Sequence, residues 1–355
     1  MLVVLSTDLG VGLERAAQLA AVYALFYGLG QPLWGIVSDR LGRVGVLRIA
    51  LFGAALGSLA SMLVPGEVPL LIARGFTGLM VGALYPMLIT LVGDTMTGAG
   101  RYREISNLQT VSALGTTVAT LAAGALASWL DWRVVFGVTL VGSAAAFVAL
   151  LGTGNGRPEP SAGRLLAALR AWPLYLYGLA FFEGAVLLGT LTYIVPAMEH
   201  AGVPVALAGV LAATYGIGIV VGSRLVNRVA ARTGRPVVVA IGGAFLVAGY
   251  LLAALLGDPA TLAVTALLVG LSNSFMHSSI QGWATAVAPS ARATTVSFFA
   301  TSMFVGAGVA TGISAGTAAS GDYRTIFILT AAFAVLVAAA AAISFARWLR
   351  THSMG

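Results

Sequence analysis

The sequence predicts an all-α protein that crosses a membrane many times. Of the 355 residues, 59% are hydrophobic and only 9% are charged, whereas soluble domains are about one quarter charged. Apolar runs recur along the whole chain, and about 20 helical residues suffice to cross a bilayer core of about 30 Å. Since lipid offers no hydrogen-bond partners, each run must satisfy its own backbone amides and is therefore expected to be a helix.

Eleven spans follow from these runs. They cover residues 16–37, 44–64, 68–92, 105–129, 133–151, 172–196, 205–226, 236–256, 260–286, 294–315 and 324–346. Residues 152–170 contain two prolines, several glycines and three arginines, which predict a long connector. We therefore expect an N-terminal helical half over 1–151, the connector over 152–170, and a C-terminal six-helix half over 171–355.

The basic residues predict the orientation. All nineteen are arginine, and fifteen fall in one alternating set of loops and in the C-terminus. The positive-inside rule makes that side, and the C-terminus, cytoplasmic. This asymmetry explains the net charge of +7 without a nucleic-acid partner. Arginine without lysine, beside abundant alanine and glycine, suggests a prokaryotic source and hence its plasma membrane. The absence of cysteine excludes disulfides and thiol chemistry.

The two halves are related by an internal repeat with an offset close to 189. The landmarks are residues 131–136 and 322–327, Tyr27 and Tyr215, Arg103 and Arg292, and the regions that begin at Gly35 and Gly222. A parallel repeat of six-helix halves is a known transporter plan. By the same offset, most of the first helix of the first half is missing. We expect Met1 to be an internal start; the alternative is an eleven-helix chain with an external N-terminus.

A short loop motif is expected directly after the first span. Gly35, Asp39, Arg40, Gly42 and Arg43 stand at the fixed positions of GxxxDRxGR. This pattern resembles the loop signature of the major facilitator superfamily (MFS). The resemblance implies a secondary transporter in which the loop latches the two halves on the cytoplasmic side. Asp39 could accept charge-assisted hydrogen bonds from arginines or from a helix N-terminus. The alternative, a loop that only sets topology, explains the arginines but not Asp39 with two placed glycines.

Two further motifs bear on the resemblance. Arg74 and Gly78 resemble the family's RxxxG motif, so Arg74 should face the bundle interior with a partner, or else snorkel to the interface. The second copy of the loop carries Asn227 in place of an aspartate. Gly115 and Gly124 match the antiporter motif only in part, because no proline lies between them.

Glu183 is the sharpest candidate for a functional residue. It lies about eleven residues into the span 172–196, near the midplane, where substrate and coupling-ion sites of such transporters lie. Removal from water favours the neutral carboxyl, which could then exchange a proton. The alternative is a permanently protonated group that bonds between helices.

Three polar stripes could line a cavity or join helices. Asn273, His277 and Gln281 recur every four residues, and His277 could exchange protons with Glu183 or bind substrate. The other stripes are Tyr23, Tyr27 and Gln31, and Gln109, Ser112, Thr116 and Thr120. Interhelical hydrogen bonding explains the first stripe equally simply, and packing in helix interfaces is the expected role of each of the other two taken alone. Asp94 and Glu104 could pair with nearby arginines, but we expect them to be solvated.

The sequence therefore predicts alternating-access transport of a small amphiphilic organic solute, by proton-coupled efflux. The alternatives are an uptake symporter of the same fold and a non-transporting membrane sensor or regulator. The chain carries no HExxH, GxSxG or GxxxxGK[ST] motif, so we expect no enzyme, ATP site, metal or cofactor. The expected partners are the solute, the proton and the lipid bilayer, and the expected state is a monomer.

Overall fold

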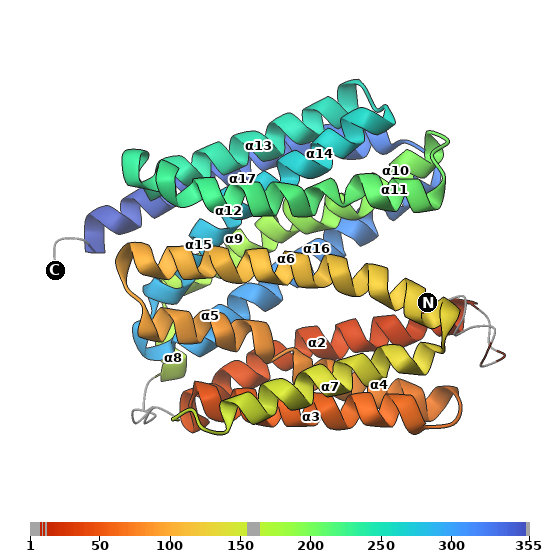
Figure 1. Ribbon diagram of the computed structural model, residues 1–355. Coiled ribbons are helices and arrows are strands. Elements are labelled where there is room, and N and C mark those ends of the chain that lie inside the picture. Colours follow the sequence, from red (N-terminus) through yellow and green to blue (C-terminus); the bar gives the residue numbers. More distant parts are fainter. Residues whose placement is uncertain (1–7, 9, 11–12, 155–163, 353–355) are drawn as a thin grey trace. The chain divides into compact units, whose positions relative to one another are not determined.

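A computed structural model describes residues 8, 10, 13–154 and 164–352 (Figure 1). Across these residues the chain is helical and contains no strand, which confirms the all-α prediction. Before the gap the helices are α2 (Leu13–Leu41), α3 (Arg43–Leu63), α4 (Glu67–Val81), α5 (Leu84–Thr95), α6 (Gly98–Trp129) and α7 (Trp132–Leu150).

After the gap, the α-helices are α8 (Arg164–Ala168), α9 (Ala171–Gly184), α10 (Ile194–His200), α11 (Val205–Ala212), α12 (Thr214–Thr233), α13 (Arg235–Leu255), α14 (Pro259–Ser272), α15 (Ser278–Val287), α16 (Arg292–Ala319) and α17 (Tyr323–His352). Two π-helical turns, η1 (Ala185–Gly189) and η3 (Asn273–His277), interrupt the second half. The 3₁₀ turns η2 (Thr190–Tyr193) and η4 (Pro289–Ala291) complete the element order.

The described chain is that of a multi-pass membrane protein. Nine of its helical segments are long and apolar enough to cross a bilayer. They coincide with nine of the predicted spans. The other two predicted spans, 16–37 and 105–129, are helical as α2 and α6 but are not among the nine.

Several predicted spans are not continuous helices. The span 68–92 breaks between α4 and α5 at Gly82 and Ala83. A Cβ at Gly82 would collide with the carbonyl oxygen of Tyr27, and Pro86 has no amide hydrogen to continue the ladder. The span 205–226 breaks at Ala213, where the Thr214 hydroxyl donates to the carbonyls of Leu211 and Ala263, both at 2.7 Å.

The predicted loops are shorter than the sequence suggested. Helix α2 continues to Leu41, so most of the GxxxDRxGR motif is helical and only Gly42, with φ +85°, separates α2 from α3. Gly234, with φ +84°, makes the same one-residue link between α12 and α13. Such positive φ values favour glycine. The predicted connector also contains the short helix α8.

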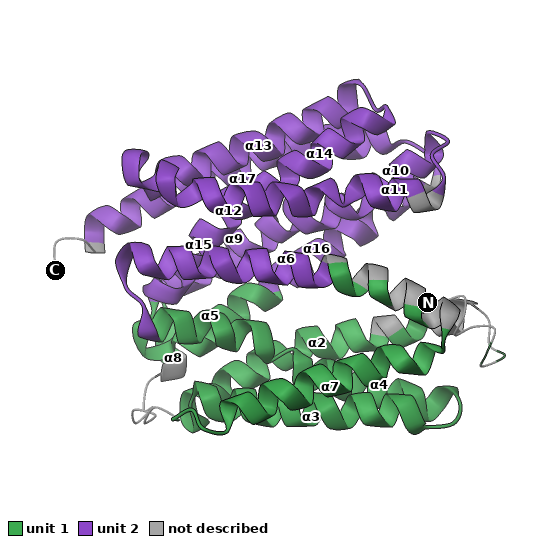
Figure 2. Cartoon of the chain, in the orientation of Figure 1, with its two compact units in different colours: residues 1–94, 118–170, 288–301 green, residues 95–117, 171–287, 302–355 purple. Residues whose placement is uncertain are grey.

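The chain divides into two compact units (Figure 2). Unit 1 comprises residues 1–94, 118–170 and 288–301, and unit 2 comprises residues 95–117, 171–287 and 302–355. Helices α6 and α16 are therefore each divided between the units. Within unit 1, α2 packs on α4 and α3 packs on α7; within unit 2, α13 packs on α17 and α12 packs on α14.

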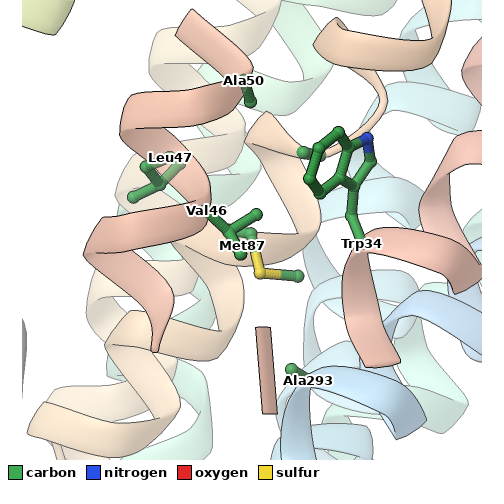
Figure 3. Close-up of a cluster of buried hydrophobic side chains, with 7 residues drawn as sticks. Trp34, Val46, Leu47, Ala50, Met87 and Ala293 are labelled. Carbon is green, nitrogen blue, oxygen red and sulfur yellow. The ribbon is translucent and has the colours of Figure 1, made fainter. Parts of the chain in front are cut away.

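The core of unit 1 includes one cluster near the predicted motif (Figure 3). Its buried members are Trp34, Val46, Leu47, Ala50, Ala83, Met87 and Ala293. The indole nitrogen of Trp34 donates a hydrogen bond of 2.7 Å to the carbonyl of Leu79. This bond fixes the ring while its face packs against the other members of the cluster. This cluster joins the end of α2 to the first turn of α16.

The internal repeat reappears in the packing of each unit. In unit 1, Gly82 abuts the carbonyl of Tyr27, and Gly30 abuts the carbonyl of Leu79. In unit 2, Gly270 abuts the carbonyl of Tyr215, and Gly218 abuts that of Leu267. Each residue of the second set lies 188 positions after its counterpart. Both helix pairs thus use glycines to bring their backbones together, as membrane helices commonly do.

Candidate functional site

The candidate site of unit 2 centres on Glu183. Its side chain is 0% exposed, and neither carboxylate oxygen accepts a hydrogen bond from the described residues. The Nδ1 atom of the buried His277 lies 3.4 Å from its Oε1 atom. The sequence named both residues, and the structure brings them together from helices that are far apart in the chain.

A π-helical turn adjoins each member of this pair. Glu183 stands in the last turn of α9, directly before η1, and His277 is the last residue of η3. A π-turn inserts one extra residue into a helix and often marks a functional site, because it disturbs the regular ladder of backbone hydrogen bonds. Both groups thus lie where their helices are least regular.

Glycines fix the backbone around Glu183. A Cβ at Gly184 would collide with the carbonyl of Met303, and a Cβ at Gly306 would collide with that of Phe181. Helices α9 and α16 are therefore in backbone contact on both sides of Glu183.

The rest of the predicted stripe meets two other helices. The Asn273 side-chain amide donates a hydrogen bond of 2.8 Å to the Tyr215 hydroxyl on α12. The Gln281 side-chain oxygen accepts one of 3.4 Å from Gln109 on α6. The stripe thus joins its helix to α12 and to α6 by hydrogen bonds.

The other polar residues that the sequence analysis named on α6 are Ser112, Thr116, Thr120 and Glu104. Ser112 and Thr116 are exposed, and the Thr116 hydroxyl donates a hydrogen bond of 2.9 Å to the carbonyl of Ser112. The side chain of Thr120 lies outside the described residues. Glu104 accepts a hydrogen bond of 3.2 Å from Asn107.

Arg74 in unit 1 is held by aromatic rings. Its guanidinium carbon lies 4.4 Å from the ring centroid of Tyr23 and 5.0 Å from that of Phe136. The expected partner of this intramembrane arginine is thus the π-face of two rings. Such cation–π contacts stabilise a desolvated guanidinium.

The stripe on α2 contains a buried amide without a visible partner. The rings of Tyr23 and Tyr27 are stacked with centroids 6.3 Å apart. One turn further, Gln31 is only 1% exposed, and neither its Oε1 nor its Nε2 makes a hydrogen bond within the described residues. Such a buried amide is costly, because an unsatisfied polar group removed from water loses its hydrogen bonds.

The motif residues form a hydrogen-bonded cluster within unit 1. One Asp39 oxygen accepts from Arg43 at 2.9 Å, and the other accepts from the Thr294 hydroxyl of α16 at 2.6 Å. Asp39 thus bonds to an arginine and to a side-chain hydroxyl in the first turn of α16. Arg40 is exposed. Gly35 abuts Ser297, so this glycine allows α2 and α16 to approach closely.

Asp94 corrects one expectation. The sequence analysis favoured a solvated charge, but Asp94 accepts from Arg43 at 2.8 Å and also pairs with Arg292 of α16. Two arginines from separate helices therefore compete successfully with water. The sequence hid this arrangement because Arg292 lies 198 residues from Asp94.

The second copy of the motif is more complete than the sequence indicated. Arg235 donates a hydrogen bond of 3.0 Å to the Asn227 side chain and stacks 3.9 Å from the centroid of Tyr102 on α6. Gly234 and Arg235 thus take the places of Gly42 and Arg43. Sequence reasoning missed them because four extra residues separate them from Asn227; the repeated Gly-Arg pair was the available signal.

Comparisons with known proteins bear on this arrangement. The family model of the Major Facilitator Superfamily matches residues 1–197 and 174–353. Over 139 residues, 38% of this chain, the sequence is 31% identical to the triacylglyceride transporter of Mycobacteroides abscessus. It is 32% identical over 143 residues, 39% of this chain, to that of Mycobacterium tuberculosis. Each matched segment spans 27% of the relative's length.

Solved structures match the fold along most of the chain. The fucose:proton symporter FucP of E. coli has a TM-score of 0.76 at 14% identity and covers 92% of this chain and 90% of its own. The human organic anion transporter MFSD10 has a TM-score of 0.74 at 17% identity and covers 95% and 87%. At these identities the likeness shows the fold alone.

Proposed function

The chain belongs to the Major Facilitator Superfamily of transporters, and we propose that it exports an amphiphilic, lipid-like solute by alternating access in exchange for protons. In this proposal Glu183 carries the coupling proton and His277 is its partner. Asn273 and Gln281 of unit 2, and Tyr27, Gln31 and Arg74 of unit 1, are each proposed to contact the solute. The protein acts in the plasma membrane of a prokaryote, with its C-terminus in the cytoplasm.

One observation carries the proposal. Glu183 is fully buried without an accepted hydrogen bond in the described structure, and its nearest ionisable group is His277 at 3.4 Å. A purely structural carboxyl would be expected to bond to a fixed donor, because a buried polar atom without one costs free energy. A carboxyl that must bind and release a proton benefits from the absence of such a donor.

The charge balance of the pair explains how protonation can follow solute binding. The pair is neutral overall when the carboxyl is protonated and the imidazole is neutral, or when the carboxyl is ionised and the imidazole carries the extra proton. Adding one proton to either state gives a net positive charge, and removing one gives a net negative charge. Each charged state is costly away from water. Both side chains are buried in this structure, so the neutral state is favoured here; a conformational change on solute binding that admits water to the pair would permit proton release or uptake.

The solute class rests on composition and on the relatives. The proposed binding groups are amides, hydroxyls and aromatic rings, with Arg74 covered by rings. This surface suits a molecule that is mainly apolar and carries few hydrogen-bonding groups. The mycobacterial relatives named triacylglyceride transporters support the same class.

Proton flux into proteoliposomes tests the function. The protein is reconstituted with an internal pH dye, and dioleoylglycerol, triolein or the polar sugar fucose is added. We expect lipid-dependent flux in the wild type that Glu183→Gln abolishes. The matched control is Glu199→Gln, which changes an exposed carboxylate of the same membrane span and should retain the flux.

Other outcomes would favour the alternatives. Flux with fucose but not with lipids would support an uptake symporter. Equal flux in Glu183→Gln and the wild type would exclude Glu183 as the proton carrier. Binding of lipid without flux in any folded variant would support a membrane sensor.

A further inference from the structure

Arg74 is a cation inside the membrane-spanning part of unit 1 that contacts no acidic side chain. It lies in α4, within the candidate span 67–95. Its guanidinium makes cation–π contacts with the rings of Tyr23 and Phe136, but it makes no hydrogen bond or ion pair within the described part of the chain. An arginine in a bilayer is costly unless another group meets its charge and its N–H donors. A ligand that supplies a negative charge would therefore stabilise Arg74.

The described acidic side chains of unit 1 are engaged away from Arg74. Four of them pair with other arginines: Asp8, Asp39, Asp94 and Asp131. Glu67, in the first turn of α4, lies about 10 Å from Arg74 along the helix axis. Among the described residues of this unit, no carboxylate is thus in contact with the Arg74 guanidinium.

The rings hold the guanidinium in place without using its hydrogen-bond donors. Phe136 is 5% exposed and belongs to a buried cluster with Leu19, Leu70 and Trp132, so its ring is fixed by the core. A cation–π contact uses the positive charge, whereas a carboxylate or phosphate binds through the N–H groups. Arg74 itself is only partly buried, so a ligand can reach those groups from the surface of the unit.

A second polar group without a partner lies on the helix that contacts Arg74. Tyr23, Tyr27 and Gln31 recur every four residues along one side of α2, and the two tyrosine rings are stacked. Gln31 is 1% exposed, and neither atom of its amide has a hydrogen-bond partner within the described residues. This side of α2 thus leads from the Arg74 cation, along two aromatic rings, to a buried amide that can donate and accept.

We propose that Arg74 binds the anionic head group, a phosphate or a carboxylate, of the lipid-like solute, and that Gln31 bonds to its ester or hydroxyl oxygens. The inference rests on the proposed transport function and narrows its solute to an anionic amphiphile. The anion and the guanidinium neutralise each other and form two parallel charge-assisted hydrogen bonds, so neither is left as an unpaired charge away from water. A neutral glyceride keeps the apolar and amide contacts but leaves Arg74 unpaired, so it binds more weakly.

Two lipids that differ only in the phosphate test the role of Arg74. Purified protein in a neutral detergent is titrated into phosphatidic acid or diacylglycerol with the same fluorescent acyl chain, and fluorescence anisotropy gives the two dissociation constants. We expect the wild type to bind phosphatidic acid about tenfold more tightly, the effect of one hydrogen bond to a charged group. Arg74→Gln should abolish this preference. Arg133→Gln is the matched control and should keep it, because Arg133 also contacts a ring but already pairs with Asp8 and Asp131.

A third variant separates the amide from the charge. Gln31→Leu should weaken the binding of both lipids by a similar factor and leave the preference for phosphatidic acid intact, because the amide bonds to oxygens that the two lipids share. Unchanged affinities for both lipids in Gln31→Leu would exclude the amide from the site. Inorganic phosphate in excess should not displace phosphatidic acid, since it has no apolar chains; full displacement would show a site for a free anion and contradict a lipid-like ligand.

The wild type alone can overturn the inference, even if a variant does not fold. Equal affinities for phosphatidic acid and diacylglycerol would exclude an anion site, and proton exchange at Glu183 would still be decided separately by the flux measurement. Full preference for phosphatidic acid in Arg74→Gln, folded by circular dichroism, would assign the anion to another group. Binding of neither lipid by the wild type would contradict both the anion site and the lipid-like solute.

Discussion

The sequence singles out individual polar residues more readily than it identifies their partners. Glu183, His277 and Arg74 stand out in the sequence because polar groups within membrane spans are costly. The sequence analysis raised a proton exchange between Glu183 and His277, but spacing could not show that the two groups lie 3.4 Å apart, since their helices are brought together only by the tertiary fold. The rings around Arg74 were likewise hidden, because Tyr23 and Phe136 look like ordinary membrane residues.

The aromatic contacts of Arg74 yield a prediction at this scale. A double-mutant cycle with Arg74→Gln and Tyr23→Leu should give a coupling free energy of about 0.5 to 2 kcal/mol, the range of cation–π contacts. The free energy of unfolding is measured by titration with SDS. The control cycle replaces Tyr23→Leu by Phe26→Leu, and its coupling should be smaller. Strict additivity of Arg74→Gln and Tyr23→Leu would contradict the contact.

At the scale of elements, the sequence located the helices but not their irregularities. Hydrophobic runs place every predicted span on helical structure, because length and apolarity are the signals that a bilayer imposes. The break at Gly82 and the π-turns η1 and η3 could not be predicted, since they arise where one helix presses on another. The missed Gly234–Arg235 link shows the same limit for an insertion within a repeat.

The contact between α9 and α16 predicts a sharp difference between two glycines. Gly306→Ala should lower the free energy of unfolding by about 1 to 3 kcal/mol, because overpacking forces the backbones apart. Gly308→Ala is the matched control, since a Cβ there meets no atom within 4 Å. Thermal unfolding followed by circular dichroism measures both. Similar losses in the two variants would contradict the close approach.

The N-terminus of α14 predicts a pH-dependent cap. Asp258 accepts hydrogen bonds from the amides of Ala260 and Thr261, both at 3.1 Å, and from the Thr261 hydroxyl. The hydrogen bond from the Thr261 hydroxyl is the largest cause that lowers the pKa of Asp258 below its ordinary value of 3.8, and the bond from the Thr261 amide is the next. Since the folded pKa is depressed, the cap stabilises the protein above about pH 4 and is lost as the pH falls through the folded pKa.

Asp258→Ala should therefore lower the melting temperature at pH 7, and the difference from the wild type should shrink at low pH. Melting temperatures measured between pH 7 and pH 3 test this expectation. Asp258→Asn, which can still accept at the helix N-terminus, should lose less at pH 7. A difference that is the same at all pH values would show that the carboxylate charge has no part in the cap.

At the scale of the whole molecule, the repeat was the most informative feature of the sequence. An offset close to 189 was predicted from scattered landmarks, and glycine–carbonyl contacts repeat at 188. The sequence did not reveal that the first residues of α6 and of α16 group with the opposite half of the chain in the two compact units. Within those groupings Asp39, Asp94 and Arg235 contact partners that are distant in the chain.

The absence of native cysteine makes the orientation directly testable. Ser320→Cys, between α16 and α17, should react with a membrane-impermeant maleimide in intact cells. Thr351→Cys, near the end of α17, should react only after permeabilisation. Both positions are exposed, so access depends on the side of the membrane. The reverse pattern would contradict the positive-inside assignment.

The central claim is that Glu183 exchanges a proton when solute binds, and proton release in detergent solution tests it most directly. Purified protein in a weakly buffered solution with a pH indicator is mixed with dioleoylglycerol. We predict about one proton exchanged per bound solute in the wild type and in Glu199→Gln, and none in Glu183→Gln although solute still binds. Equal proton exchange by Glu183→Gln and the wild type would contradict the account.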